Sequence, residues 1–192
     1  MEGMLRHCLR EHLEATTGFF EENAGEIIKA SQVIIHALQR GGKLLVCGNG
    51  GSAADAQHMA GELVNRFLKE RRPLAAVALS TDTSVITSIG NDYGFEYIFE
   101  KQVRAIGRQG DVLMVISTSG NSPNCVRAVE ASKEMGISTI GLLGRDGGVL
   151  RKMVDLPLIV RVTSTPRAQE VHILTIHVIC QLIEEGIFGE KN

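Results

Sequence analysis

From Lys43 onward, short apolar runs alternate with segments of helical periodicity, and this alternation constrains the fold more than any other feature. The apolar runs are rich in Val, Ile and Leu, which is typical of parallel strands covered on both faces. They occupy residues 44–47, 75–79, 112–117, 139–143 and 158–162. The helical patterns occupy residues 53–68, 97–106, 124–135, 148–153 and 166–185. The sequence therefore predicts a three-layer, doubly wound α/β fold with a five-stranded parallel sheet, flavodoxin-like or Rossmann-like.

The residues before the first apolar run are predicted to form two helices that separate near residues 22–25. Their apolar residues, such as Leu5, Leu9 and Leu13, recur at helical spacing and lie on more than one face. We therefore expect residues 1–40 to form a helical arm used in oligomerisation, with a monomer whose ends are buried as the alternative. Residues 41–192 are expected to form the α/β core of the same single domain, including the C-terminal helix.

Charge and composition exclude several classes of partner. The chain has 20 Lys and Arg residues against 22 Asp and Glu residues, a formal net charge of -2. No strong field attracts nucleic acid or an anionic membrane, so we expect any phosphate to be bound locally, by loops and helix ends. No apolar stretch approaches about 18 residues, so no membrane span is predicted. The four cysteines lie far apart, which suits reduced thiols in a cytoplasmic protein.

Two polar loops directly follow predicted strands. Residues 48–52 read GNGGS and precede a helix, and residues 117–122 read STSGNS and precede a helix opened by Pro123. Glycines let backbone N–H groups converge on an anion, and a helix N-terminus adds partial positive charge. Ordinary turns between strands and helices are the alternative for either loop alone. Two such loops in one doubly wound chain favour phosphate binding.

Neither loop matches a nucleotide-binding motif. Neither ends in the Gly-Lys-Ser/Thr of a Walker motif, and Ala53 stands where the third glycine of G-x-G-x-x-G belongs. A dinucleotide is therefore disfavoured, and a small phosphate ester fits better.

Two helices carry candidate acid/base or metal-binding residues. His58 and Glu62 are four residues apart, so they project from one helix face. Gln169 and His177 are separated by about 80° around the last helix, whereas His172 points to a different face. A solvent-exposed His58–Glu62 pair and a core His177 are the alternatives. The functional interpretation requires the last helix to pack against the helix of His58 and Glu62.

Several segments together give the chain a family resemblance that covers nearly its whole length. These segments are CGNGGSAADAQHMAGEL, SIGNDYGF, GDVLMVISTSGNSPN, LLGRDGG and RAQEVHILTIHVICQLIE. They resemble the phosphoheptose isomerase family of the SIS (sugar isomerase) superfamily. The resemblance implies conversion of the sugar phosphate sedoheptulose 7-phosphate to D-glycero-D-manno-heptose 7-phosphate, through a cis-enediol, by a homotetramer with sites at subunit interfaces.

The resemblance also implies roles for individual residues. The phosphate would be held by Ser117, Thr118, Ser119 and Ser122. The sugar would contact Asn49, Gly50, Gly51, Ser52, Glu62, Asn91, Asp92 and Gln169. The acid/base pair would be Glu62 and His177. One zinc ion per subunit would be held by His58, Glu62, Gln169 and His177. Arg66 and Thr81 are weaker transfers.

The implied zinc leaves an alternative open. A carboxylate bound tightly to zinc is a poorer base, so either the metal is structural or inhibitory, or Glu62 changes partners during turnover.

A second function stands beside the isomerase. A bacterial relative with this fold is a non-catalytic adaptor that binds the replication initiator protein, and it shares SAADAQH with this chain. That relative lacks the acidic residue at the position of Glu62, which favours the enzyme here. Relatives that act on other ketose phosphates or on N-acetylmuramic acid phosphate usually have longer chains, so 192 residues favour the heptose enzyme.

Overall fold

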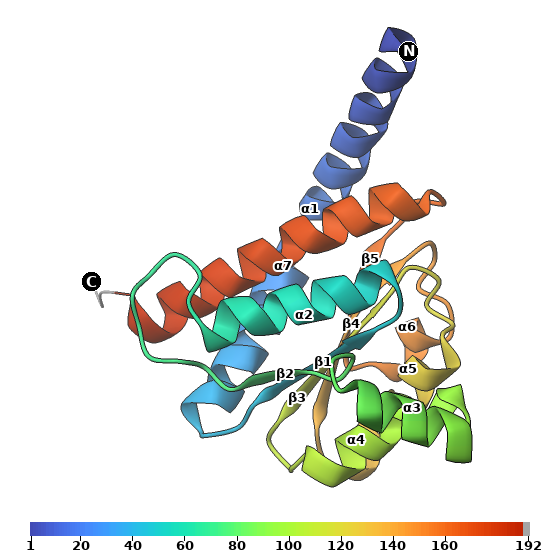
Figure 1. The fold of residues 1–192 in the computed structure, drawn as a ribbon. Helices are drawn as coiled ribbons and strands as arrows, with labels where there is room; N and C mark the ends of the chain where they lie inside the picture. The colour runs from blue at the N-terminus through green and yellow to red at the C-terminus, as the bar shows by residue number, and fades with distance from the viewer. Residues whose placement is uncertain (190–192) are drawn as a thin grey trace.

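The computed structural model describes residues 1–189 and confirms the predicted five-stranded parallel sheet (Figure 1). The strand order is β2-β1-β3-β4-β5, which is the flavodoxin-like order. The strands are β1 (Leu44–Gly48), β2 (Ala76–Ala78), β3 (Val112–Ser117), β4 (Ser138–Gly144) and β5 (Leu156–Val160). Every residue of β1 and β3 is buried, as expected for strands covered on both faces.

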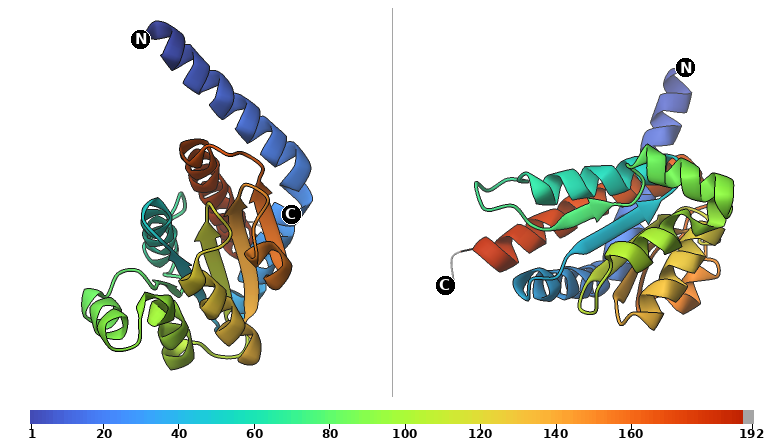
Figure 2. Two further views of the ribbon diagram at one scale, coloured as in Figure 1. Left: turned by 90° about the vertical axis from the view of Figure 1, so that its right-hand side faces the viewer. Right: turned by 60° about the horizontal axis from the view of Figure 1, so that its bottom comes forward.

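Helices cover both faces of the sheet and form the predicted three layers (Figures 1 and 2). One layer holds α1 (Glu2–Gln39), α2 (Gly51–Val64) and α7 (Thr165–Phe188). The other holds α3 (Thr83–Asp92), the 3₁₀ turn η1 (Phe95–Tyr97), α4 (Ile98–Ile106), α5 (Pro123–Glu134) and α6 (Leu150–Met153). Alternate strand residues serve the two layers: Leu44 and Val46 belong to the first core, whereas Leu45 and Cys47 belong to the second.

The strand order places both polar loops at one crevice. The chain leaves β1 toward β2 at one edge, whereas β3 pairs on the other side of β1 and leads toward β4. Gly48 at the end of β1 pairs in register with Ile116 near the end of β3. The loops that follow these two strands therefore flank the topological switch point, where open α/β sheets bind ligands.

The prediction of two N-terminal helices is wrong, because α1 is one continuous helix of 38 residues. The predicted break near residues 22–25 contains one glycine, which costs a helix only about 1 kcal/mol, and Asn23, whose amide donates to the Phe19 carbonyl within the helix. The C-terminal half packs along α7 and buries residues such as Ile27 and Ile34. This burial offsets the unfavourable glycine. The first turns of α1, over residues 2–7, are exposed and extend away from the body of the molecule (Figure 2), whereas Cys8 and His12 already contact α7.

The predictions also missed a helix between the second strand and η1. Helix α3 is capped by Asp82, whose carboxylate accepts from the Val85 N–H at 3.0 Å. No α3 residue is fully buried, so the segment lacks the strong apolar periodicity that reveals a core helix. The Asp-Thr-Ser sequence at residues 82–84, which is typical of a helix N-cap, indicates where this helix begins.

Helix α7 departs from the expectation of no membrane-length apolar segment. By length and composition it could cross a membrane, with a mean hydropathy of 1.4 over its most apolar window. In this structure α7 contacts α1 along its length and also packs on α2, and residues such as Val171, Ile176 and Ile179 lie in the core.

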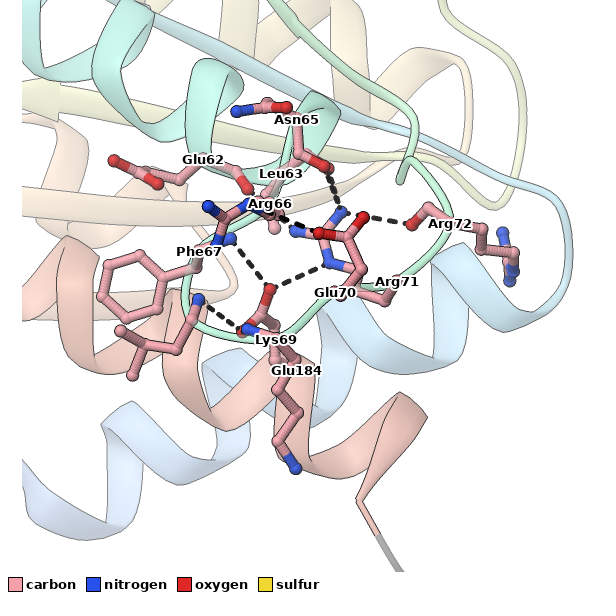
Figure 3. A network of polar contacts seen from close by, with 11 residues as sticks. Glu62, Leu63, Asn65, Arg66, Phe67, Lys69, Glu70, Arg71, Arg72 and Glu184 are labelled. Atoms are coloured by element: carbon pink, nitrogen blue, oxygen red, sulfur yellow. Dashed lines mark hydrogen bonds and ion pairs between the residues drawn. The ribbon is translucent and has the colours of Figure 1, made fainter.

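A buried ion pair joins the segment that follows α2 to helix α7 (Figure 3). Arg71 Nε donates to Glu184 Oε1 at 2.9 Å, and both side chains are only 1% exposed. Glu184 also accepts from three consecutive backbone N–H groups, those of Phe67, Leu68 and Lys69, at 2.8–2.9 Å. Burial alone would raise the pKa of Glu184, but these three donors and Arg71 lower it below its ordinary value.

The guanidinium group of Arg71 also closes the end of α2. It donates to the carbonyl oxygens of Glu62 at 2.8 Å and Leu63 at 2.7 Å, and to that of Asn65 at 3.2 Å. The last carbonyls of a helix have no partner within the helix, so Arg71 satisfies groups that would otherwise be buried without a hydrogen bond. The Arg71 side chain therefore holds the turn after α2 in place and satisfies three of its backbone carbonyl oxygens.

Replacing Glu184 by Gln should lower the free energy of unfolding by about 3–5 kcal/mol, because it leaves the Arg71 charge buried without a counter-charge. Urea unfolding at pH 7 measures this difference. The matched control is Glu185→Gln at the next position, where the carboxylate is 53% exposed and pairs with Lys69. An exposed pair contributes less than about 1 kcal/mol.

The destabilisation should also depend on pH. Because the folded pKa of Glu184 is lowered, its contribution is fully present above the unfolded value of about 4.3 and is lost as the pH falls through the folded pKa. The difference between wild type and Glu184→Gln should therefore shrink below about pH 4.3. Equal losses in Glu184→Gln and Glu185→Gln would contradict the assigned role of the buried pair.

Candidate active site

The first loop, which follows β1, is shaped by close backbone packing. Gly50 adopts a φ of 56°, a left-handed conformation that favours glycine, and caps the start of α2. Gly51 lies against the amide group of Gln169 from α7, and a Cβ at this position would require that flexible side chain to shift. Ser52 is buried in the first turn. Predicted residues Asn49, Gly50, Gly51, Ser52 and Gln169 therefore gather at one place.

The second loop, which follows β3, gathers three hydroxyl groups. Ser117 Oγ lies 3.1 Å from Ser122 Oγ and 3.4 Å from Ser119 Oγ, and it accepts from the Gly120 N–H at 3.1 Å. Thr118 lies in the same turn and is half-buried. The turn leads directly into α5, whose first residue is Pro123. Clustered hydroxyls beside a helix N-terminus form a neutral, donor-rich surface that suits a phosphate group.

A pair of asparagines, of which the sequence analysis did not identify Asn124, joins the first loop to the start of α5, directly after the second loop. The amides of Asn49 and Asn124 exchange hydrogen bonds of 2.9 and 2.8 Å. Both residues, together with Ser122, line a hollow of about 530 Å³. Asn124 has no local sequence signal, because its partner lies 75 residues away along the chain.

Three of the four predicted metal residues, which include both predicted acid/base residues, meet where α2 packs on α7, whereas the fourth, Gln169, has its amide beside Gly51. His58 Nε2 lies 3.1 Å from Glu62 Oε1 and 3.0 Å from His177 Nε2. One possible ligand atom from each of the three residues lies within 4.8 Å of the other two. Two imidazoles and a carboxylate are ligands that Zn²⁺ prefers, and donors around a tetrahedral zinc stand about 3.3 Å apart. The three side chains therefore fit a metal ion. The interpretation of His177 as an ordinary core histidine is wrong.

The surroundings of His177 come from the turn after α2. The ring of Phe67 stacks on the His177 ring with centroids 5.6 Å apart and planes 28° apart. Phe67 is held by its N–H bond to Glu184, and the Glu62 carboxylate points to the same side of the turn as the Phe67 ring (Figure 3). The buried ion pair thus supports the residues that surround the cluster.

His172 confirms the predicted separation of faces on α7. It is fully buried away from the cluster, and burial lowers the pKa of its imidazole to about 4. The ring is therefore neutral at pH 7.

Asp55 is a further polar residue on α2 that the sequence analysis did not single out. It precedes His58 by three residues and Glu62 by seven, so all three share one helix face. Its Oδ2 atom is buried without a hydrogen-bond partner among the described residues. Burial raises the pKa of Asp55 to about 6, and the nearby His58 opposes this shift.

The remaining predicted residues lie outside these contacts. Asn91 and Asp92 end α3, where the Asn91 amide donates to the Asp92 carboxylate at 2.8 Å, and both are exposed. Thr81 donates to a backbone carbonyl in its own turn at 2.9 Å. Arg66 faces a glutamate four residues later at 3.6 Å. None of these four is among the residues that line the hollow with Asn49.

Comparison with known proteins agrees with this arrangement. Residues 9–144 match the SIS domain family. The phosphoheptose isomerase of Trichlorobacter lovleyi is 51% identical over 189 residues, covering 98% of this chain and 96% of the relative. That of Geotalea daltonii is 51% identical over 187 residues, covering 97% of each. The solved phosphoheptose isomerase of Neisseria gonorrhoeae superposes with a TM-score of 0.91 at 45% identity, covering 96% of this chain and 98% of that one.

These matches extend over nearly the whole chain and include all the segments that form the two loops and the histidine–glutamate cluster. The chain therefore belongs to the phosphoheptose isomerase family of SIS-domain proteins.

Proposed function

We propose that this chain converts sedoheptulose 7-phosphate to D-glycero-D-manno-heptose 7-phosphate, the first step of nucleotide-activated heptose biosynthesis. The observation that carries the proposal is the meeting of Glu62 and His177, which come from two helices, in a chain whose two polar loops flank the switch point. The names of relatives at 51% identity support the same reaction.

The loops supply the binding contacts in this proposal. Phosphate oxygens accept hydrogen bonds from the hydroxyls of the second loop, which are Ser117, Thr118, Ser119 and Ser122. The sugar hydroxyls contact the first loop and the end of α3, at Asn49, Gly50, Gly51, Ser52, Asn91 and Asp92, with Gln169 beside Gly51. Hydroxyl and backbone donors satisfy the anion at these loops, and Arg127 lines the hollow beside them.

The chemistry is a proton transfer between two carbons. The Glu62 carboxylate takes a proton from C1 of the open-chain ketose, which forms a cis-enediol, and returns that proton to C2. A second proton must move from the oxygen on C1 to the oxygen on C2, and His177 moves it because an imidazole both donates and accepts. These two transfers convert the ketose to the aldose with no net gain or loss of protons.

Zinc belongs to the proposal as a resident ion of each subunit. His58, Glu62 and His177 would hold it, with Gln169 as the fourth proposed ligand. When bound, zinc would polarise a carbonyl as a Lewis acid, and Glu62 would have to leave the ion to act as the base. The Gln169 amide lies beside Gly51.

Glu62→Gln should lower kcat for sedoheptulose 7-phosphate by about 10²- to 10⁴-fold, because the amide cannot accept the C1 proton. Binding of the sugar phosphate should remain measurable by calorimetry, since size and shape are kept. Glu130→Gln, an exposed change on α5, is the control. Turnover is assayed with zinc and with chelator.

Full activity in Glu62→Gln would remove Glu62 from the mechanism. No product from the wild-type protein under either condition would contradict the isomerase and favour the adaptor that binds a replication initiator.

His58→Ala and His177→Ala should each weaken Zn²⁺ binding by more than about 100-fold, since even loss of an outer-shell partner costs 10- to 100-fold. Calorimetric titration with Zn²⁺ measures this directly, without reference to activity. His36→Ala is the control, because His36 bonds only within α1. Unchanged affinity in both cluster variants would show that this cluster is not the zinc site.

The proposal includes a cytoplasmic homotetramer whose sites lie at subunit interfaces. Its support is the N-terminal half of α1, where Leu5, Leu9 and Leu13 are 67%, 54% and 55% exposed in a row at helical spacing. In the same proposal the chain is one SIS domain, with residues 1–40 as the helical arm and residues 41–192 as the core. Residues of the second half of α1 already belong to the core of their own subunit.

Leu9→Glu should shift the protein from tetramer toward smaller species, because it places a charge in the apolar row. Light scattering after gel filtration measures the mass. Arg10→Glu, an exposed polar position next to it, is the control. A wild-type protein that runs as a monomer would contradict the assembly.

A further inference from the structure

The side-chain amides of Asn49 and Asn124 each donate a hydrogen bond to the other. Asn49 Nδ2 donates to Asn124 Oδ1 at 2.9 Å, and Asn124 Nδ2 donates to Asn49 Oδ1 at 2.8 Å. Asn49 directly follows β1, and Asn124 is the second residue of α5. The pair therefore spans the switch point between the first and the second loop.

A third hydrogen bond fixes which way both amides point. The N–H of Cys125 donates to Asn124 Oδ1 at 2.9 Å, and an N–H group can donate only to the oxygen of an amide. This orientation directs the Asn124 NH₂ group to Asn49, so Asn49 must present its oxygen to that group. Asn124 is only 2% exposed, which leaves its amide no alternative partner in solvent.

The fixed pair leaves part of the Asn49 amide free. An amide has two N–H donors and an oxygen with two lone pairs. Asn124 uses one donor and one lone pair of Asn49, so one N–H and one lone pair remain. Asn49 is half-buried and lines the hollow of about 530 Å³, together with Ser122 of the second loop. A sugar hydroxyl, which both donates and accepts, matches this remaining pair of groups.

We propose that Asn124 is a positioning residue for the sugar: it acts through Asn49 and fixes that amide with one N–H and one lone pair toward a substrate hydroxyl. The inference rests on the proposed function, because that function makes Asn49 a sugar contact. Without Asn124 the Asn49 amide can rotate and must be ordered again on binding, which weakens sugar binding but leaves the phosphate hydroxyls in place.

The test is a double-mutant cycle on Asn49→Ala, Asn124→Ala and the double variant, read as the Kd of sedoheptulose 7-phosphate and the Ki of inorganic phosphate. Each single change should weaken sugar phosphate binding about 10-fold, the size of one lost hydrogen bond. The double variant should be no weaker than Asn49→Ala alone, because Asn124 acts only through Asn49. Phosphate binding should stay within about twofold in every variant.

Asn124→Asp separates positioning from folding. The carboxylate still accepts from the N–H groups of Cys125 and Asn49, but it cannot donate to Asn49 Oδ1. The buried carboxylate should lower the Tm, so binding is measured well below that Tm, where the affinity for sugar phosphate should fall at least as far as in Asn124→Ala. Asn23→Ala, which removes an amide that bonds within α1, is the control for asparagine loss.

Two results would overturn the inference. Additive losses in the double variant would show that Asn124 acts independently of Asn49. A parallel loss of phosphate binding would show that Asn124 only supports the second loop. Failure of the proposed function is distinguishable, because it appears as absence of turnover in the wild-type protein, whereas the cycle is read from binding.

Discussion

The ion pair between Arg71 and Glu184 sets how α2 and α7 lie against each other. Two opposite charges removed from water are stable only when hydrogen bonds satisfy the rest of both groups, and here the turn after α2 provides three N–H donors and several carbonyl acceptors. Any displacement of this turn would leave the Glu184 carboxylate or the Arg71 guanidinium group buried without its hydrogen-bond partners. Glu62 precedes this turn and His177 lies two helical turns before Glu184, so the distance between them follows from the same constraint.

The proposed phosphate site depends on where the strands end rather than on net charge. The formal charge is -2, and the described hydroxyl loop contains no Lys or Arg. Adjacent strands β1 and β3 bring two polar loops to one crevice, where backbone, hydroxyl and amide groups are the main donors and where Arg127 and Glu96 also line the hollow. A neutral site of this kind depends on orientation, so the hydrogen bonds within and between the loops matter as much as the donors themselves.

The sequence predicted the layers, the sheet and both loops, because buried strands and glycine turns leave local patterns. It also placed His58, Glu62 and His177 on helix faces that could meet, and the packing of α7 on α2 confirms that they do. The break in α1 was wrong because packing outweighs one glycine, and α3 was missed because it buries little. Asn124 was missed because a bond across 75 residues depends on the folded topology.

The length of α1 has a consequence for how the protein folds. At 1.5 Å per residue its 38 residues span about 57 Å, and its first turns, over residues 2–7, are exposed. A helix of that size without a packed face is marginal in water, since nucleation is costly and each residue adds little. If the chains associate through this segment, as proposed, its helical content would follow the law of mass action, growing as chains associate and falling on dilution. Folding of these turns and the proposed assembly would then be one coupled equilibrium.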